Sequence, residues 1–380
     1  MTNLHFTFPS DMPSNTAAWL QAAKERPLTV KEAPYVLPGP DEMVVKVRAV
    51  AINPIDRMKQ YMGDVLYGHI KYPFVLGFDL AGEVFEIGQS VTRFRVGDRV
   101  LALAIGMIKP VNRSSEGAFQ EYAVVRPQLA SPIPDNVSFE QAAVLPLGLC
   151  TAACALFKKD RLGLQFPLSP KRKSTGKTVL IWGGSTSVGT NAIQLAVAAG
   201  YDVITTCSPR NFELVKKLGA KDAFDYNSKT VVSDIVAAFK SRTSAGALAI
   251  GKNSVENCIE ILHQCRGEKM IALASLPIPD PFPQTFILPR VVFSVLPWMI
   301  SIFIKSKLRS TRTTFFVADE IVGTEIESEI FANYLPNALT KGEFACVPEP
   351  QVIGKGLEHV QEGFDVLGKG VSAKKMVVSL

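Results

Sequence analysis

The chain has 380 residues, of which 47% are hydrophobic and 20% are charged. This composition is ordinary for a globular protein with a large core, so it excludes a disordered or fibrous chain, and the length predicts two domains. The 41 basic and 35 acidic residues give a net charge of +6. Because the basic residues are scattered and not clustered, we expect no nucleic-acid partner.

Residues 1–149 contain short apolar runs separated by proline and glycine turns. The pattern predicts strands at 43–50, 82–87 and 98–103, each bounded by turn residues. Short strands with frequent turns indicate a small, mostly antiparallel β domain.

From residue 177 the pattern changes to alternating strands and helices. The run 177–182 (KTVLIW) is continuously apolar, which is typical of a strand covered on both faces. A helix follows at 188–199, with Gly200 as its expected C-cap. Further strands are predicted at 202–206, 223–226, 246–250 and 269–274, and further helices at 211–218, 231–240 and 254–265. Such repeated units predict a doubly wound parallel sheet and the fold class α/β.

The C-terminal part is predicted to contain a strand at 315–318, a helix at 330–339 and a closing strand at 373–380. We expect the closing strand to return to the first domain. The edge strand 315–318 leaves the oligomeric state open between a monomer and a homodimer.

One apolar segment, 291–304 (VVFSVLPWMISIFI), contains 14 uncharged residues including Pro297 and is followed by Lys305 and Lys307. A membrane-spanning helix needs about 20 apolar residues, so we expect no membrane contact. The favoured interpretation is a helix in the core or at a subunit contact. A wall over an apolar substrate and an interfacial membrane helix are the alternatives.

The cysteines and the N-terminus indicate the compartment. The six cysteines include no CxxC pair, which argues against a disulfide scaffold and the usual structural zinc spacing. Residues 1–15 are polar and proline-rich, without the apolar run of a secretory signal. We therefore expect a cytoplasmic protein with reduced thiols.

The most informative motif is a glycine-rich turn between the strand 177–182 and its helix. Gly183, Gly184 and Gly189 let a pyrophosphate approach the backbone, and the following helix N-terminus favours an anion. Ser185, Thr186 and Ser187 add hydroxyl donors. The motif predicts a dinucleotide site, and the alternative is a doubly wound domain that binds nothing.

The end of the next strand indicates which dinucleotide binds. An NAD site usually has an acidic residue there, but Asp202 lies at the opposite end of the strand. Ser208 and Arg210 instead suit a 2′-phosphate. NADPH is therefore the expected cofactor, and a solvated Arg210 is the alternative.

The histidines do not support a catalytic zinc site. Of the four, only His263 lies near cysteines, and it falls on a predicted helix of the second domain. Without a metal to polarise an alcohol-level carbonyl, hydride addition to the β-carbon of an activated C=C is the expected chemistry.

Further motifs carry a resemblance to a known family. They are AAWL at 17–20, AINPID at 51–56, GFDLAG at 77–82, RVGDRV at 95–100, GAFQEY at 117–122, LPLG at 145–148 and CSPRN at 207–211. With the glycine-rich turn, they make the chain similar to the medium-chain dehydrogenase/reductase superfamily. Within it, the chain resembles the zinc-free quinone-oxidoreductase and enoyl-reductase branch, and in particular the fungal enoyl reductases that act in trans in polyketide pathways.

The resemblance implies a GroES-like β-rich catalytic domain at 1–149 and 323–380, with a Rossmann NADPH-binding domain at 150–322. Zinc-dependent members carry a ligand cysteine at the position of Asn53 and Gly-His-Glu at the position of Gly77-Phe78-Asp79. Both departures agree with the zinc-free interpretation.

The resemblance also implies the site residues. Asn53 and Thr151 are expected beside the nicotinamide as catalytic residues. The expected cofactor contacts are Asn53, Gly183, Gly184, Ser185, Thr186, Ser187, Val188, Ser208, Arg210, Asn211, Tyr226, Ala274, Ser275, Lys369 and Gly370. Tyr61 is a candidate proton donor, with Tyr67 or water as alternatives. Lys59 is displaced by one position from the lysine of related sequences, which weakens a substrate role for it.

Together these features predict an NADPH-dependent, zinc-independent reduction of an enone or enoyl substrate of apolar character. A polyketide-type thioester and a polyketide synthase partner in secondary metabolism are what the resemblance implies. A quinone oxidoreductase and a non-catalytic NADPH-binding sensor are the alternatives.

Overall fold

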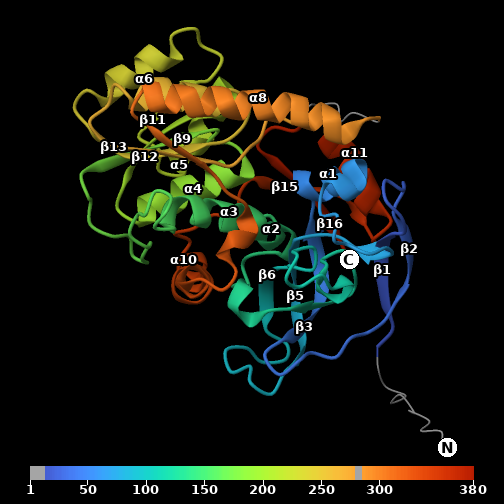
Figure 1. Ribbon diagram of the computed structural model, residues 1–380. Helices are drawn as coiled ribbons and strands as arrows, with labels where there is room; N and C mark the ends of the chain where they lie inside the picture. The colour runs from blue at the N-terminus through green and yellow to red at the C-terminus, as the bar shows by residue number, and fades with distance from the viewer. Residues whose placement is uncertain (1–12, 279–284) are drawn as a thin grey trace, which may run out of the picture.

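The chain builds a β-rich part, continues into a strand-and-helix part and returns to the first part at its end (Figure 1). The computed structural model describes residues 13–278 and 285–380. The expectation of no secretory signal falls mainly on residues 1–12, which lie outside the described residues.

The strands fall into three sheets. Two of the sheets are built from β1 (Asn15–Leu20), β2 (Thr29–Ala33), β3 (Met43–Ala51), β4 (Phe74–Val75), β5 (Asp79–Ile87), β6 (Arg99–Leu103), β7 (Tyr122–Val125), β8 (Ala130–Pro132), β15 (Glu349–Lys355) and β16 (Lys374–Ser379). The third contains β9 (Lys177–Trp182), β10 (Asp202–Cys207), β11 (Asp222–Asp225), β12 (Thr243–Ala249), β13 (Gly267–Leu273) and β14 (Arg312–Phe315).

The α-helices are α1 (Pro54–Met62), α2 (Phe139–Ala143), α3 (Pro146–Phe157), α4 (Ser187–Ala198), α5 (Phe212–Lys217), α6 (Val231–Phe239), α7 (Ser254–Leu262), α8 (Ile287–Leu308), α9 (Glu325–Glu327), α10 (Leu335–Thr340) and α11 (His359–Gly368). Short 3₁₀ turns lie at Gly63–Val65, Ser114–Glu116, Pro127–Leu129, Pro209–Asn211 and Ala318–Ile321, and a π-helix at Ser328–Tyr334 precedes α10.

The six-stranded sheet has the order β11-β10-β9-β12-β13-β14, and all its pairings are parallel. Alternate residues of β9 serve opposite faces: Val179 and Ile181 pack with α3 and α4, whereas Leu180 and Trp182 pack with α6 and α7. Both faces are thus covered, which explains the continuous apolar run and confirms the predicted doubly wound sheet.

The seven-stranded sheet has the order β15-β16-β3-β5-β6-β8, with β7 also paired to β3. Its ladders are antiparallel except that of β15 with β16. β16 pairs with β3, so the end of the chain does return to the first domain, as predicted. The exact domain boundaries at 149/150 and 322/323 remain a prediction.

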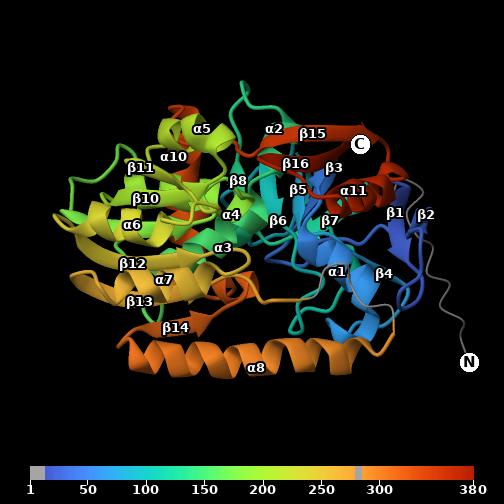
Figure 2. The same ribbon diagram turned by 90° about the horizontal axis from the view of Figure 1, so that it is seen from above.

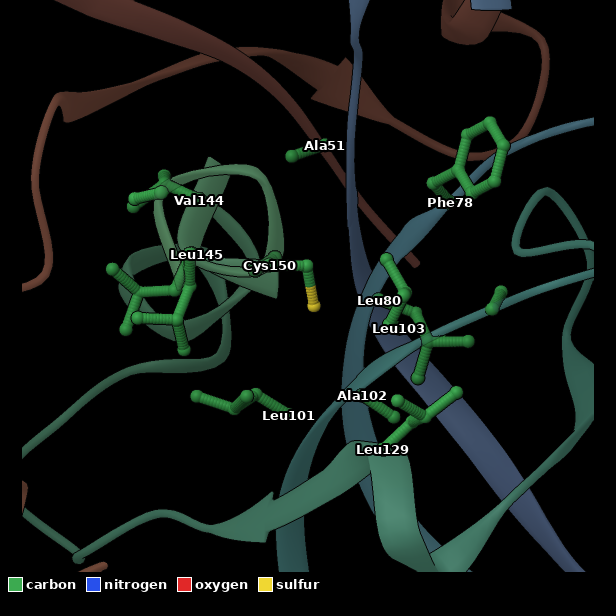
Figure 3. Close-up of a cluster of buried hydrophobic side chains, with 14 of the residues drawn as sticks. Ala51, Phe78, Leu80, Leu101, Ala102, Leu103, Leu129, Val144, Leu145 and Cys150 are labelled. Carbon is green, nitrogen blue, oxygen red and sulfur yellow. The ribbon is translucent and has the colours of Figure 1, made fainter. Parts of the chain in front are cut away.

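The hydrophobic core continues from this sheet into the helices that follow it. Leu80, Leu101 and Leu103 from β5 and β6 lie opposite Leu145 and Cys150, which enter from the start of α3 (Figure 3). Five of the six cysteines are buried and all six are free, so the thiols act mainly as small apolar side chains.

Two predicted elements differ from the structure. The strand expected at 315–318 lies earlier, at β14, and 318–321 forms a 3₁₀ turn. The apolar segment expected at 291–304 belongs to the 22-residue α8, which runs along one side of the molecule (Figure 2). Only Ile287, Ile302 and Ser306 of α8 are buried, so the core part of the favoured interpretation was wrong, while the subunit contact stays a prediction.

Among the described residues, two stretches are long and apolar enough to cross a membrane. The stretch Phe139–Phe157 is 72% buried, as expected of a core segment, whereas Ile287–Leu308 is only 11% buried. The expectation that the second segment is too short to span a membrane was therefore wrong, because the helix has 22 residues and not 14.

Candidate active site

The glycine-rich turn after β9 is held against β10. Gly183 adopts a φ of 93° and its N–H donates to Thr206 Oγ1, while the Gly184 N–H donates to the Thr206 carbonyl. A Cβ on Gly184 would lie 2.1 Å from Thr205 Oγ1, and one on Gly189 would lie 2.2 Å from the Gly183 carbonyl oxygen. The turn therefore requires glycine for close backbone packing.

The N-terminus of α4 is capped from within this turn. Thr186 Oγ1 accepts a hydrogen bond from the Gly189 N–H and donates one to the Gly183 carbonyl. The first-turn amides of Ser187 and Val188 have no preceding helical carbonyl to bond to. Since Ser185, Ser187 and Val188 are partly exposed, these amides and hydroxyls form a surface suited to a pyrophosphate.

The end of β10 brings two predicted residues together. Ser208 Oγ lies 3.1 Å from the Tyr226 hydroxyl, and Arg210 is exposed two residues after Ser208, in the turn that leads to α5. The neighbouring Asn211 is buried and donates from Nδ2 to Ser372 Oγ at 3.2 Å. This bond joins the nucleotide-binding domain to the closing segment, in which Lys369 and Gly370 are exposed.

Ala274 and Ser275 follow β13, the strand beside β12. Ser275 Oγ accepts from the Gly251 N–H, and the Ala274 N–H donates to the Ala249 carbonyl. The turns after β9, β10, β12 and β13 all leave the same edge of the parallel sheet, which is where ligands bind in this architecture. The predicted cofactor residues in these four turns are therefore brought to one edge.

A buried polar cluster lies at the N-terminus of α1. Asn53 donates from Nδ2 to Asp79 Oδ2 at 3.0 Å, and its Oδ1 accepts from Lys375 Nζ at 2.5 Å. Lys375 Nζ also lies 2.9 Å from Asp79 Oδ2, with both side chains at most 4% exposed. The other Asp79 oxygen accepts from the Leu147 N–H. Asn53, Asp79 and Lys375 therefore form a closed triad.

Asp56 completes this cluster. Its Oδ2 accepts from the Asn53 N–H, while the buried Oδ1 has no hydrogen-bond partner among the described residues. Burial raises the pKa of Asp56 to about 8, and the nearby carboxylate of Asp79 adds to the rise. The Asp56 carboxyl therefore holds its proton at neutral pH more readily than an ordinary aspartic acid.

The neighbouring aromatic and helical residues complete the surroundings. Phe78, at the position where the resemblance implies a histidine in zinc-dependent members, is buried among apolar side chains (Figure 3). Thr151 is half-buried on α3 and donates from Oγ1 to the Leu147 carbonyl at 2.7 Å. The Leu147 N–H also donates to Asp79, so Leu147 connects Thr151 to the triad.

The two candidate tyrosines have different environments. The ring of Tyr61 lies between the guanidinium groups of Arg26 and Arg57, at 4.3 and 4.4 Å from the ring centroid. Tyr67 is more deeply placed, and burial, together with the nearby carboxylate of Asp319, raises its pKa. Tyr67 therefore stays protonated at neutral pH.

Lys59 has a structural role. It is fully buried, and its Nζ donates to the Gly63 and Tyr67 carbonyls and to the Tyr72 hydroxyl, with Asp64 at 3.5 Å. These bonds fix the loop after α1, in agreement with the doubt over its role in substrate binding.

Sequence reasoning missed Lys375 and Asp56. Lys375 lies 322 positions from Asn53, and one basic residue in a closing strand carries no signal of where it points. For Asp56 a signal existed, because Asn53 followed by Pro54 and, three residues after Asn53, by an acid is a helix-capping pattern. That pattern predicts a cap but not complete burial.

Known families match both parts of the chain. The alcohol dehydrogenase GroES-like domain matches residues 39–135, and the zinc-binding dehydrogenase family matches residues 187–293. Dehydrogenase pigH of Monascus ruber is 54% identical over 97% of this chain and 100% of its own length. Trans-enoyl reductase himH of Aspergillus japonicus is 36% identical over 96% of this chain and 97% of its own.

Solved structures agree on the fold. The CurK enoyl reductase superposes with a TM-score of 0.70 at 18% identity, covering 96% of this chain and 99% of its own. The quinone oxidoreductase from Coxiella burnetii gives a TM-score of 0.66 at 23% identity, covering 97% and 100%. The sheets, the glycine-rich turn and these relatives together show that the chain is an oxidoreductase of the medium-chain dehydrogenase/reductase superfamily, whose members bind NAD(P), and lies near the fungal enoyl reductases.

Proposed function

We propose that the protein uses NADPH to reduce a C=C bond conjugated to a carbonyl, without a catalytic metal. The observation that carries the proposal is the Asn53–Asp79–Lys375 triad. It puts a buried ammonium group beside Asn53, the residue that by resemblance takes the position of a zinc-ligand cysteine. The nicotinamide then has no Lewis acid beside it, which disfavours alcohol chemistry and favours an acceptor that delocalises its own charge.

A zinc ion does not suit these residues. Asn53 takes the position that the resemblance gives to a zinc-ligand cysteine, but its Oδ1 already accepts from Lys375 Nζ. Phe78 offers no atom that could bind zinc. A divalent cation here would also be repelled by the Lys375 ammonium. Stoichiometric zinc in the purified protein would contradict this part of the proposal.

The dinucleotide suits the sheet edge. The turn from Gly183 to Gly189 and the first amides of α4 would hold the pyrophosphate, and Ser208, Arg210 and Tyr226 would hold the 2′-phosphate. When bound, NADPH supplies a hydride for the β-carbon of the substrate. Arg210 is the residue that favours NADPH over NADH, because it offers an unshielded guanidinium where NADH has only a hydroxyl.

The protein groups have three tasks in this reaction. Lys375 and Asp79 fix the rotamer of Asn53, so that its side-chain amide keeps one orientation beside the nicotinamide. Thr151, held by the Leu147 carbonyl, shapes the adjoining wall. A protonated Tyr67 or a water molecule returns a proton to the α-carbon, and the pairing of Tyr61 with two guanidinium groups favours a structural role for that residue.

The proton donor can be assigned by matched substitutions. Tyr67→Phe should lower kcat by about 10² to 10⁴-fold if its hydroxyl is the general acid, while Tyr61→Phe changes kcat little. Near-normal kcat in Tyr67→Phe would assign the step to water, and a large loss only in Tyr61→Phe would restore the sequence-based assignment.

The names trans-enoyl reductase himH and CurK enoyl reductase support an enoyl substrate. We further propose, on the resemblance to the fungal enoyl reductases alone, a thioester of polyketide type and a polyketide synthase partner in cytoplasmic secondary metabolism. The quinone oxidoreductase structure supports a quinone as the second candidate acceptor.

One assay separates the candidates. Purified protein is mixed with NADPH and, in turn, with an enoyl thioester, a small enone and a quinone, and the loss of absorbance by NADPH is followed. Consumption that is fastest with the thioester supports the proposal, and consumption with the quinone alone supports the second candidate. A flat trace with every acceptor, alongside tight NADPH binding, would mean a non-catalytic binder.

A further inference from the structure

Helix α8 presents an apolar face that the described part of the chain does not cover. The side chains of that face are between 43% and 79% exposed, and the larger ones are Leu288, Val292, Phe293, Leu296, Met299, Ile300, Phe303, Ile304 and Leu308. Soluble monomers rarely expose so many large apolar side chains in one contiguous strip. At 22 residues the helix is about 33 Å long.

The opposite face of α8 attaches it to the nucleotide-binding domain. Ile302 is buried, Trp298 packs against the same apolar cluster as α7, and Trp298 Nε1 donates to Glu256 at 2.7 Å. Near the C-terminal end Arg309 pairs with Glu260 at 3.0 Å. These contacts hold the C-terminal half of α8 against the domain, and the helix runs along one side of the molecule (Figure 2).

The charged side chains of α8 itself and of its flanking residues have one sign. The range 285–312 contains no aspartate or glutamate, while Arg290 lies near one end and Lys305 and Lys307 are exposed near the other. Lys307 lies over the ring of Phe303, 5.7 Å from its centroid. Basic side chains thus flank the apolar strip at both ends, and Lys307 lies against one of its aromatic rings.

We propose that α8 is an interfacial membrane anchor that lies flat on an anionic phospholipid surface. Apolar side chains would enter the boundary between headgroups and acyl chains, and the basic side chains would pair with phosphate and carboxylate headgroups. The proposal is independent of the enzymatic one. It replaces the expectation of no membrane contact, which rested on a 14-residue segment and not on the 22-residue helix.

Two other arrangements suit the structure less well. A spanning helix would have to give up the contacts of Trp298 and Ile302 with the domain. In a pair of α8 helices from two copies of this chain, the basic ends would find no carboxylate, because the range 285–312 has none. An anionic bilayer offers both an apolar layer for the strip and anionic headgroups for the basic side chains.

Vesicle flotation with the full chain, without coenzyme or substrate, tests the anchor. One set of vesicles contains phosphatidylcholine alone, and the other contains about one third phosphatidylserine. The wild-type protein should float with the anionic vesicles and less with the neutral ones. The double substitution Phe293→Glu with Phe303→Glu should abolish flotation.

A matched control carries the same change elsewhere. Leu37 and Val96 are 58% and 64% exposed, close to the 61% of Phe303, so Leu37→Glu with Val96→Glu should float like the wild type. Lys305→Gln with Lys307→Gln should weaken binding to anionic vesicles by about fivefold for each lysine. Circular dichroism would confirm that each variant is folded.

Three results would overturn the proposal. The wild type could stay unbound with both kinds of vesicle, or Phe293→Glu with Phe303→Glu could float unchanged. The third result is a wild-type protein that does not bind vesicles but forms a dimer, which this double substitution dissociates. A second copy of the chain would then cover the strip.

Discussion

Replacing Lys375 with methionine should destabilise the protein through a carboxylate left unpaired in its interior. The substitution keeps the side-chain length but removes the ammonium that lies 2.9 Å from Asp79 Oδ2. Asp79 is fully buried and would retain only the hydrogen bonds from Asn53 Nδ2 and the Leu147 N–H. Breaking a buried ion pair by removing one partner costs about 3–5 kcal/mol, and the two remaining bonds place the expected loss near the lower end.

A double-mutant cycle isolates the pair. Asp79→Asn should also destabilise, because it leaves the Lys375 ammonium buried with Asn53 Oδ1 as an acceptor. The double variant removes both charges, so it should lose less stability than the sum of the two single losses. Guanidinium unfolding followed by circular dichroism gives the free energies. A Lys375→Met loss below about 1 kcal/mol, with strictly additive single effects, would refute the account of the triad.

Three further predictions concern the coenzyme and the pH dependence of stability. In fluorescence titrations, Arg210→Ala should weaken NADPH binding by about tenfold and leave NADH binding unchanged. Tenfold is the low end for a hydrogen bond to a charged group, because Arg210 is exposed. Equal losses for both coenzymes would show that Arg210 does not bind the 2′-phosphate. Gly189→Ala puts a Cβ 2.2 Å from the Gly183 carbonyl oxygen, so it should weaken both coenzymes alike, and unchanged calorimetric affinity would contradict the cradle. Asp56 has an ordinary pKa of 3.8 but one of about 8 in the fold, so its stabilising contribution is present below pH 4 and is lost as the pH rises through 8. Asp56→Asn should flatten this fall in denaturation curves taken across that range, and an unchanged slope would show that another group causes it.

Much of the nucleotide-binding domain could be predicted because its signals are local. The run 177–182 matches β9 residue for residue, and the glycines at 183, 184 and 189 occupy a turn that leaves no room for a Cβ. The predicted residues at the carboxyl ends of β10 and β13 reach the same edge, since parallel strands all end there.

The errors have physical causes. The sequence FFVA looks more strand-like than RTTF, but pairing with β13 selects 312–315 and lets 318 begin a 3₁₀ turn. In α8 the boundary was placed at Lys305, although the aliphatic stem of lysine continues a helix well. Pro289 lies in the first turn of α8, where a missing N–H costs no hydrogen bond.

The candidate site could be predicted only in part, because its polar cluster joins distant segments. Asn53 and Asp79 lie in motifs with a recognisable pattern, but the partner that closes the triad comes from β16. Long-range pairing of this kind depends on the register of β16 against β3, which no local pattern in the last strand specifies.

The most direct test of the proposed function is to follow the transferred hydrogen. Purified protein is incubated with NADPH deuterated at C4 of the nicotinamide and an enoyl thioester, and the product is analysed by mass spectrometry and NMR. The account predicts a saturated thioester with one deuterium at the β-carbon and a solvent-derived proton at the α-carbon. A product with deuterium at the carbonyl carbon, or an unchanged thioester beside bound NADPH, would contradict it.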